Sequence, residues 1–284
     1  MRARWEALLV PSFLFCMVLL VGTQFLFIRA GFFEDLGLGL IGNQLKLVNY
    51  IELVEDPFYW ESLFLNIYLS AIVVVATLIF AYPVAYVIAR MRSRWAMILL
   101  AAIVVSSFVT IVIKALGLII IFGSDGPINS VLLGLGIVER PVKIVGNVFG
   151  VVVGLMHYVL GFMVLMLFSV IQAIPRSLEE AAQIHGASRW RVFARVVIPL
   201  SLPGVVSGAL IMFNLCMGAF VSAALLGGGK VLTLPVVIER TIVLETRYGM
   251  AGTLSAVLLV SVLLINLLSV YLIRRMRSAR LVVT

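Results

Sequence analysis

Six long apolar stretches determine what this chain can fold into. A helix needs about 20 apolar residues to cross the roughly 30 Å of hydrocarbon in a bilayer, and each stretch is about that long or longer. Hydrophobic residues make up 63% of the 284 residues and charged residues 12%, with a mean hydropathy of +1.20, more apolar than a soluble domain needs to be. The sequence therefore predicts an all-α membrane protein with one transmembrane domain, residues 1–284. The expected spans are about 8–28, 63–89, 95–122, 144–172, 202–226 and 254–273.

The first apolar stretch has some features of a signal peptide, because Arg2 and Arg4 precede it. Its uncharged run from Ala7 to Ile28 is too long for the apolar region of a signal peptide, and it lacks a convincing small-residue cleavage site. We therefore interpret this stretch as a membrane anchor that belongs to the folded protein.

The positive charges are distributed unevenly between the two sides that the six spans define. Arginines cluster at both ends of the chain, after the second span and between the fourth and fifth spans, whereas most acids fall on the other side. Because Lys and Arg are enriched in cytoplasmic loops, both termini and segment 175–199 are predicted to be cytoplasmic. This topology accounts for the net charge of +8 without a nucleic acid partner. The arginines concerned are Arg2, Arg4, Arg90, Arg92, Arg94, Arg176, Arg189, Arg191, Arg195, Arg274, Arg275, Arg277 and Arg280.

Segment 175–199 is a polar stretch between two very apolar ones. Ser177 and Glu180 have the spacing of a capping box, which predicts a helix that starts after Pro175. Gly186 is suited to end that helix in a left-handed turn, and Ser188 to cap the next helix. The segment therefore predicts a short helix–turn–helix close to the bilayer surface, with small alanines that would fit a narrow groove on a partner.

This segment resembles the cytoplasmic loop of the permease subunits of ABC importers. The family pattern is E-A-A, three residues, G, nine residues and then I-x-L-P; Val196 and Ile198 replace its Ile and Leu conservatively. The resemblance implies the type I ABC importer permease fold, in which this loop forms a coupling helix that docks into the ATP-hydrolysing subunit. The alternative is an amphipathic loop of some other membrane protein. The resemblance assigns ATPase coupling to Glu179, Glu180, Ala181, Ala182, Gly186, Ala187 and Pro199.

Three less specific motifs resemble the spermidine/putrescine branch of that family: residues 81–86, 199–204 and 225–230. The branch implies import of polyamines or a related small polar solute across a bacterial inner membrane. It also implies three kinds of protein partner: a dimer of ATP-binding cassette ATPases, a second permease that is commonly a paralogue, and a periplasmic or extracellular substrate-binding protein. Membrane lipid surrounds the spans.

Catalytic chemistry is not expected in this chain. The sequence shows no nucleophile–base pair, no phosphate-binding glycine loop of the Walker type and no paired carboxylates. Cys16 and Cys216 both lie in predicted spans without neighbouring metal ligands, and we interpret them as packing residues. We therefore expect a transport subunit without cofactor or metal, with ATP and Mg²⁺ bound by the partner ATPase.

Lys114 is the one cation inside a predicted span. A charge at mid-span is costly unless it faces water or a partner, so Lys114 either lines a substrate pathway or snorkels to the membrane surface. A cation does not by itself favour a polycationic solute, which leaves amino-acid-like, phosphonate or other anionic solutes open. Asn214 and Phe220 in the fifth span are further candidates for the pathway wall.

Two other classes of membrane protein compete with the ABC importer. An ion-coupled secondary transporter usually has membrane-embedded acids or paired broken helices, and here all acids lie outside the predicted spans. A membrane-embedded enzyme would need clustered acids or histidines near a membrane face, which the sequence lacks. Both alternatives are therefore less favoured than the importer.

Overall fold

The computed structural model describes residues 5–281, with side chains described for residues 10–271. The arginines predicted at the two cytoplasmic termini (Arg2, Arg4, Arg274, Arg275, Arg277 and Arg280) lie outside the residues with described side chains. The chain forms two compact units, and the boundary between them falls within α3 (Pro57–Arg90). Residues 1–64 and 234–284 make the first unit, and residues 65–233 make the second.

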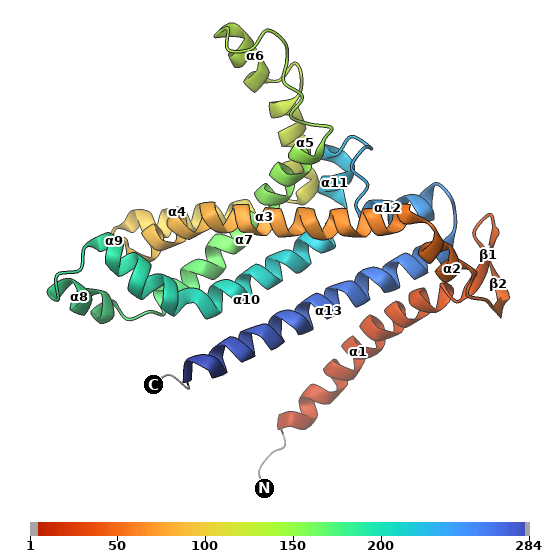
Figure 1. Cartoon of the computed structure of the whole chain (residues 1–284), viewed down its shortest axis with the longest axis horizontal. Helices are drawn as coiled ribbons and strands as arrows, with labels where there is room; N and C mark the ends of the chain where they lie inside the picture. Colours follow the sequence, from red (N-terminus) through yellow and green to blue (C-terminus); the bar gives the residue numbers. More distant parts are fainter. Residues whose placement is uncertain (1–4, 282–284) are drawn as a thin grey trace. The chain divides into compact units, whose positions relative to one another are not determined.

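The first unit combines long helices with a small hairpin that the sequence analysis did not predict (Figure 1). The antiparallel strands pair Phe33 with Leu45 and Asp35 with Ile41, and they contact the beginning of α13 together with α2. α13 also packs against α1 and α12. The elements of this unit are α1 (Trp5–Ala30), β1 (Phe33–Gly37), β2 (Leu40–Leu45), α2 (Val48–Glu55), the start of α3, α12 (Leu234–Val243) and α13 (Tyr248–Leu281).

Polar side chains hold the parts of the first unit together. The Asp35 carboxylate accepts hydrogen bonds from the backbone amides of Gly249 (2.7 Å) and Met250 (2.8 Å), which lie in the first turn of α13. The Arg247 guanidinium donates to both oxygens of Glu52, at 2.8 and 2.5 Å. This two-point ion pair ties α2 to the residue just before α13.

The second unit is built around α7 (Figure 1), which packs against α4, α5, α10 and α11. α10 approaches α7 closely at Gly204, where an added Cβ would lie 2.4 Å from the Val170 side chain. The further elements of this unit are α4 (Arg94–Phe108), α5 (Ile111–Phe122), α6 (Pro127–Gly134), α7 (Val148–Gln172), α8 (Arg176–Ile184), α9 (Arg189–Val192), the π-helix η1 (Phe193–Val197), α10 (Ile198–Met217) and α11 (Val221–Leu226).

A buried ridge on α7 forms the core of the second unit. Its side chains recur every fourth residue, so they stack along one side of the helix. Each is 0–2% exposed, which shows that this side is covered by neighbouring helices. The ridge consists of Val151, Leu155, Val159, Met163, Leu167 and Ile171.

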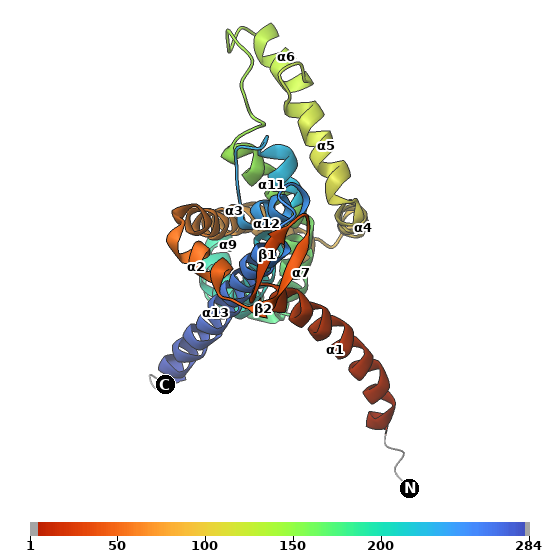
Figure 2. The same ribbon diagram turned by 90° about the vertical axis from the view of Figure 1, so that its right-hand side faces the viewer.

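Within the part of the chain that the structure describes, six helices are long and apolar enough to cross a membrane, which agrees with the number of expected spans. Their boundaries differ most in the third and fifth spans, and the third spanning segment is Ile111–Gly134 rather than 95–122. The third apolar stretch, 95–122, is not one helix, because α4 ends at Phe108 and α5 begins at Ile111 in a new direction (Figure 2). The fifth predicted span, 202–226, corresponds to a spanning helix that begins at Arg189 and ends at Met217. The remaining residues of that stretch include the separate helix α11.

The break between α4 and α5 has a local cause. Val109 and Thr110 adopt extended backbone conformations (ψ 131° and 145°), and the Thr110 hydroxyl caps the amide of Ile113 at 3.5 Å. The β-branched run from Val109 to Ile113 weakens the helix here, and Thr110 offers the backbone an alternative hydrogen bond. Hydropathy does not detect this break because apolar residues continue through it.

Candidate functional site

The 175–199 segment begins with helix α8, which starts two residues earlier than a capping box at Ser177 would require. Arg176 is the first helical residue and Pro175 the cap, without a side-chain hydrogen bond. Ser177 is therefore already inside the helix, and the predicted capping box between Ser177 and Glu180 is wrong. Proline favours this start because its fixed φ, here −58°, suits the position before a helix and the amides of the first turn need no intrahelical partner.

The turn after α8 follows the prediction. Gly186 has φ +81°, its amide donates to the Gln183 carbonyl at 2.9 Å, and the next amide, of Ala187, donates to the Ala182 carbonyl at 3.1 Å. These two bonds with a left-handed glycine form a Schellman motif. The Ser188 hydroxyl then accepts from the Arg191 amide at 3.4 Å and caps α9, so the predicted helix–turn–helix is confirmed.

Pro199 accounts for the wide turn that follows. The residues before it form the π-helix η1, and the Ile198 amide donates to the carbonyl of Phe193 five residues back. Proline has no amide hydrogen, and its ring would clash with the carbonyl four residues earlier in a regular helix. The π turn accommodates Pro199 and lets α9, η1 and α10 run on as one spanning helix.

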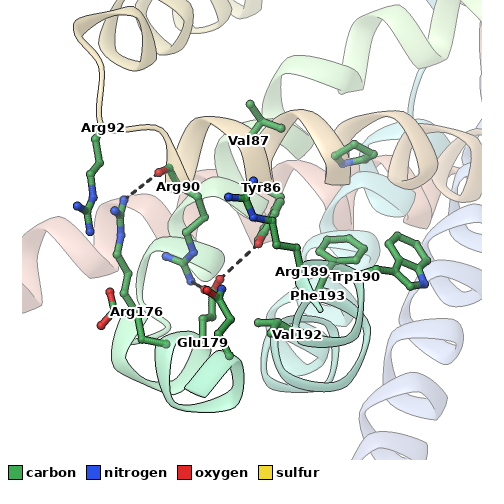
Figure 3. Close-up of a pocket in the computed structure, with 13 residues that line it drawn as sticks. Tyr86, Val87, Arg90, Arg92, Arg176, Glu179, Arg189, Trp190, Val192 and Phe193 are labelled. Atoms are coloured by element: carbon green, nitrogen blue, oxygen red, sulfur yellow. Dashed lines mark hydrogen bonds and ion pairs between the residues drawn. The ribbon is translucent and has the colours of Figure 1, made fainter. Parts of the chain in front are cut away.

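Glu179 anchors α8 to the end of α3 (Figure 3). Its side chain is buried, and its carboxylate lies 2.5 Å from the Arg90 guanidinium and accepts a hydrogen bond from the Tyr86 hydroxyl at 3.3 Å. The Arg90 guanidinium also donates to the Ile174 carbonyl at 3.2 Å. Arg176 adds a second tie by donating to the carbonyls of Ala89 and Arg90, at 3.2 and 3.3 Å. The helix–turn–helix is thus held to the end of a spanning helix.

Glu180, the next residue, is exposed instead. It is one of the residues that line a cleft of about 840 Å³ between α3, α8 and α9. Arg92 and Arg189 line the same cleft (Figure 3). Ile184 (84% exposed) and Trp190 (72% exposed) add apolar surface to the same segment. Among the candidate coupling residues, Glu179 therefore faces the protein interior. The others, Glu180, Ala181, Ala182, Gly186, Ala187 and Pro199, are exposed or half-buried.

Lys114 is 9% exposed, so it packs within the second unit, and its place in a substrate pathway stays a prediction. It lines a cavity of about 490 Å³ formed by α3, α4, α5 and α7. Asn214 and Phe220, the other two candidates, do not line this cavity: Asn214 lies half-buried on α10 and Phe220 at the start of α11.

The sequence analysis did not predict three residues that contribute to these sites. Arg90 and Tyr86 hold Glu179, and His157 lies beside Lys114 in the cavity wall. The contacts with Glu179 and the cavity shared by Lys114 and His157 join residues that are far apart in the chain. The sequence around His157 does not indicate a partner for its side chain. The cluster of arginines at the end of the second span was the one available signal for Arg90.

A set of apolar spanning helices with an anchored helix–turn–helix at the polar end of one of them is the architecture of a transport permease. The family model of the "binding-protein-dependent transport system inner membrane component" matches residues 81–278. The chain belongs to this family and is a multi-pass permease subunit of a binding-protein-dependent ABC importer.

Two kinds of permease are similar to this chain in sequence. The chain is 35% identical over 193 residues to the spermidine/putrescine permease PotB of Escherichia coli, covering 68% of this chain and 70% of PotB. It is 30% identical to PotB of Haemophilus influenzae, covering 80% of this chain and 78% of the relative. The sulfate permease CysW of Escherichia coli is 26% identical, over 77% of this chain and 74% of CysW.

Solved structures show the same fold. A chain of a bacterial alginate ABC transporter, crystallised in complex with an alginate-bound periplasmic protein, superposes with a TM-score of 0.76 at 17% identity. The match covers 95% of this chain and 94% of that one. A chain of the methionine ABC transporter MetNI superposes with a TM-score of 0.61 at 18% identity, over 78% of this chain and 98% of that one. The fold is that of type I ABC importer permeases.

Proposed function

We propose that this permease imports polyamines, or a closely related small polar amine, as one subunit of an ATP-driven importer. The similarity to the PotB permeases, which extends over two thirds or more of each chain, supports this class of solute. The observation that carries the ATP-driven mechanism is the anchoring of α8 by Glu179, which leaves Glu180 and the turn at Gly186 free for another protein.

The proposed mechanism is alternating access driven by a partner. A dimer of ATPase subunits binds ATP and Mg²⁺ and hydrolyses the ATP, and its closure moves α8. Because α8 is tied to α3 through Glu179 and Arg176, such a motion is passed to a spanning helix. A substrate-binding protein delivers the solute, and a second permease, by resemblance a paralogue, completes the pathway.

The proposed polarity places α8 and both termini in the cytoplasm. The arginines near α8, Arg90, Arg92, Arg176 and Arg189, support it, because basic residues are enriched in cytoplasmic loops. Six spans put both termini on one side, and four spans separate the N-terminus from α8. Purified ATPase subunit added to inside-out membrane vesicles should bind, whereas right-side-out vesicles should not bind it.

The importer is tested by reconstituting the permeases with their ATPase in proteoliposomes that contain sealed-in ATP. Uptake of labelled putrescine or spermidine is expected to require ATP and the binding protein, and to stop when the ATPase is left out. Uptake driven by an ion gradient without the ATPase would support a secondary transporter instead.

A second candidate solute is anionic. Lys114, a cation in a spanning segment, favours it, and the similarity to the sulfate permease CysW is compatible with it. In the same proteoliposomes, ATP-dependent sulfate uptake without polyamine uptake would select this second candidate.

A further inference from the structure

The cavity at Lys114 contains a charge that the described residues do not balance. The Lys114 ammonium forms no ion pair or hydrogen bond within residues 10–271, although its side chain is only 9% exposed. A buried ammonium is costly unless an anion or a set of acceptors surrounds it. Lys114 therefore lines the cavity with an ammonium that no described protein group pairs, which leaves it open to an anion.

The acids of the second unit are placed elsewhere. Asp125 and Glu139 are exposed beyond the end of α5, and Glu179 and Glu180 belong to the α8 segment. The walls of the cavity are mostly apolar, and Phe80, Ala102 and Leu160 are typical of them. None of the four acids of the second unit therefore pairs with Lys114.

The helix break beside Lys114 adds to the positive potential. α5 is 12 residues long, and Lys114 stands one turn after its first residue. The first amides of a helix have no intrahelical acceptors, and the helix dipole makes this end positive. The break lies between two cavity-lining residues, Ser107 of α4 and Lys114 of α5. A discontinuous helix at membrane depth is tolerated where it lines a cavity, and in transporters such helix ends bind substrate groups.

The cavity also has the size and composition of a ligand site. A volume of about 490 Å³ is within the range of small-molecule pockets, which combine apolar walls with a few convergent polar groups. Here those groups are the Lys114 ammonium, the His157 imidazole and the Ser106 hydroxyl. One ammonium and one helix end match a single negative charge better than a doubly charged anion.

We propose that this cavity binds the carboxylate of the transported solute, so that the solute is an amine that also carries a carboxylic acid. The proposal rests on the proposed function for the amine and adds the acid group. A simple diamine has no acid group to pair with the Lys114 ammonium, so it should bind this cavity more weakly than an amine that carries a carboxylate. No carboxylate lines the cavity to receive an amine, so the amine end of the solute extends out of it.

Ornithine and putrescine test the proposal, because they differ only in the carboxylate. Binding of each labelled compound is measured on the purified permease–ATPase complex without the binding protein, whose own selectivity would obscure the result. The wild-type complex should bind ornithine at least about tenfold more tightly than putrescine, and Lys114→Met should remove this preference by weakening ornithine alone. Lys114→Arg, which keeps the charge, should retain most of it.

Three outcomes separate the explanations. Equal or tighter binding of putrescine in the wild type, unchanged in Lys114→Met, would overturn the carboxylate site while leaving polyamine import intact. Loss of the second permease from the Lys114→Met complex, with ornithine binding unchanged, would show that Lys114 pairs with an acid of that subunit and would also overturn the proposal. Binding of acetate or sulfate that depends on Lys114, without binding of either amine, would instead contradict the amine class of the proposed function and the solute named here.

Discussion

Two buried charges in the second unit have opposite surroundings. Glu179 is 8% exposed and Lys114 is 9% exposed, so burial alone does not distinguish them. Glu179 has an ion pair with Arg90 and a hydrogen bond from Tyr86, whereas Lys114 faces a mostly apolar cavity with no counter-charge. The difference indicates that the first charge holds two parts of the protein together, whereas the second is the one that we propose to bind the solute.

The same comparison separates two neighbouring glutamates, of which only Glu180 belongs to the E-A-A pattern of the family. Glu179 and Glu180 are adjacent on α8, but one faces the end of α3 and the other faces the open cleft. A helical turn has 3.6 residues, so adjacent side chains point about 100° apart. We infer that Glu179 positions the coupling segment and that Glu180 contacts the partner.

The largest expected effect is on stability, from Glu179→Gln. The substitution leaves the Arg90 guanidinium buried without its counter-charge, and breaking a buried pair in this way costs about 3–5 kcal/mol. The thermal unfolding midpoint of the purified permease should fall, and trypsin should cleave more readily near Arg189. The matched control is Glu180→Gln, which changes an exposed side chain and should cost less than about 0.5 kcal/mol.

The double variant Glu179→Gln with Arg90→Gln sharpens this test. With both charges removed, no buried ion remains uncompensated, so part of the lost stability should return. Equal destabilisation by Glu179→Gln and Glu180→Gln, or no recovery in the double variant, would contradict the anchoring role.

A smaller effect on stability is expected from the loss of the Glu52–Arg247 ion pair in the first unit. The side chains of this pair are about one third exposed. Hydrogen bonds from Arg247 lower the pKa of Glu52 below its usual 4.5, against the opposing effect of burial. Stability from this pair is fully present above the unfolded pKa, and it is lost as the pH falls through the lower folded pKa. Solvent screening keeps the contribution small.

This pH dependence can be measured with Glu52→Gln. At pH 7 the variant should unfold about 2 °C below the wild type, and the gap should close as the pH falls below about 4. A gap that is constant from pH 7 to pH 3 would mean that the charge of Glu52 is not what stabilises the contact between α2 and the start of α13.

Much of the fold could be predicted because membrane spans have a strong sequence signal. Long apolar stretches gave six spans, and the glycine and serine of the turn after α8 gave its geometry, since Gly186 and Ser188 act locally. The break at Val109 and Thr110 was missed because apolar residues continue through it. The hairpin β1–β2 was missed because its short strands lie in a mixed loop without a regular alternation.

The candidate sites were predictable only in part. The family pattern located α8, and a lone lysine in an apolar span located Lys114. The pairing of Glu179 with Arg90 and the cavity that joins Lys114 with His157 depend on helix packing between distant segments. Such pairings are set by tertiary contacts, and neither spacing nor composition within one segment predicts them.

Glu180→Lys tests most directly the claim that α8 is anchored on one side and presented to an ATPase on the other. The measurement is the amount of purified ATPase subunit retained on inside-out vesicles that contain the permease, beside the unfolding midpoint of the same variant. We expect at least about a tenfold loss of bound ATPase, because the lysine puts a positive charge at the positive end of α8 and against the partner, with an unchanged unfolding midpoint. Normal retention of the ATPase by Glu180→Lys would contradict the account.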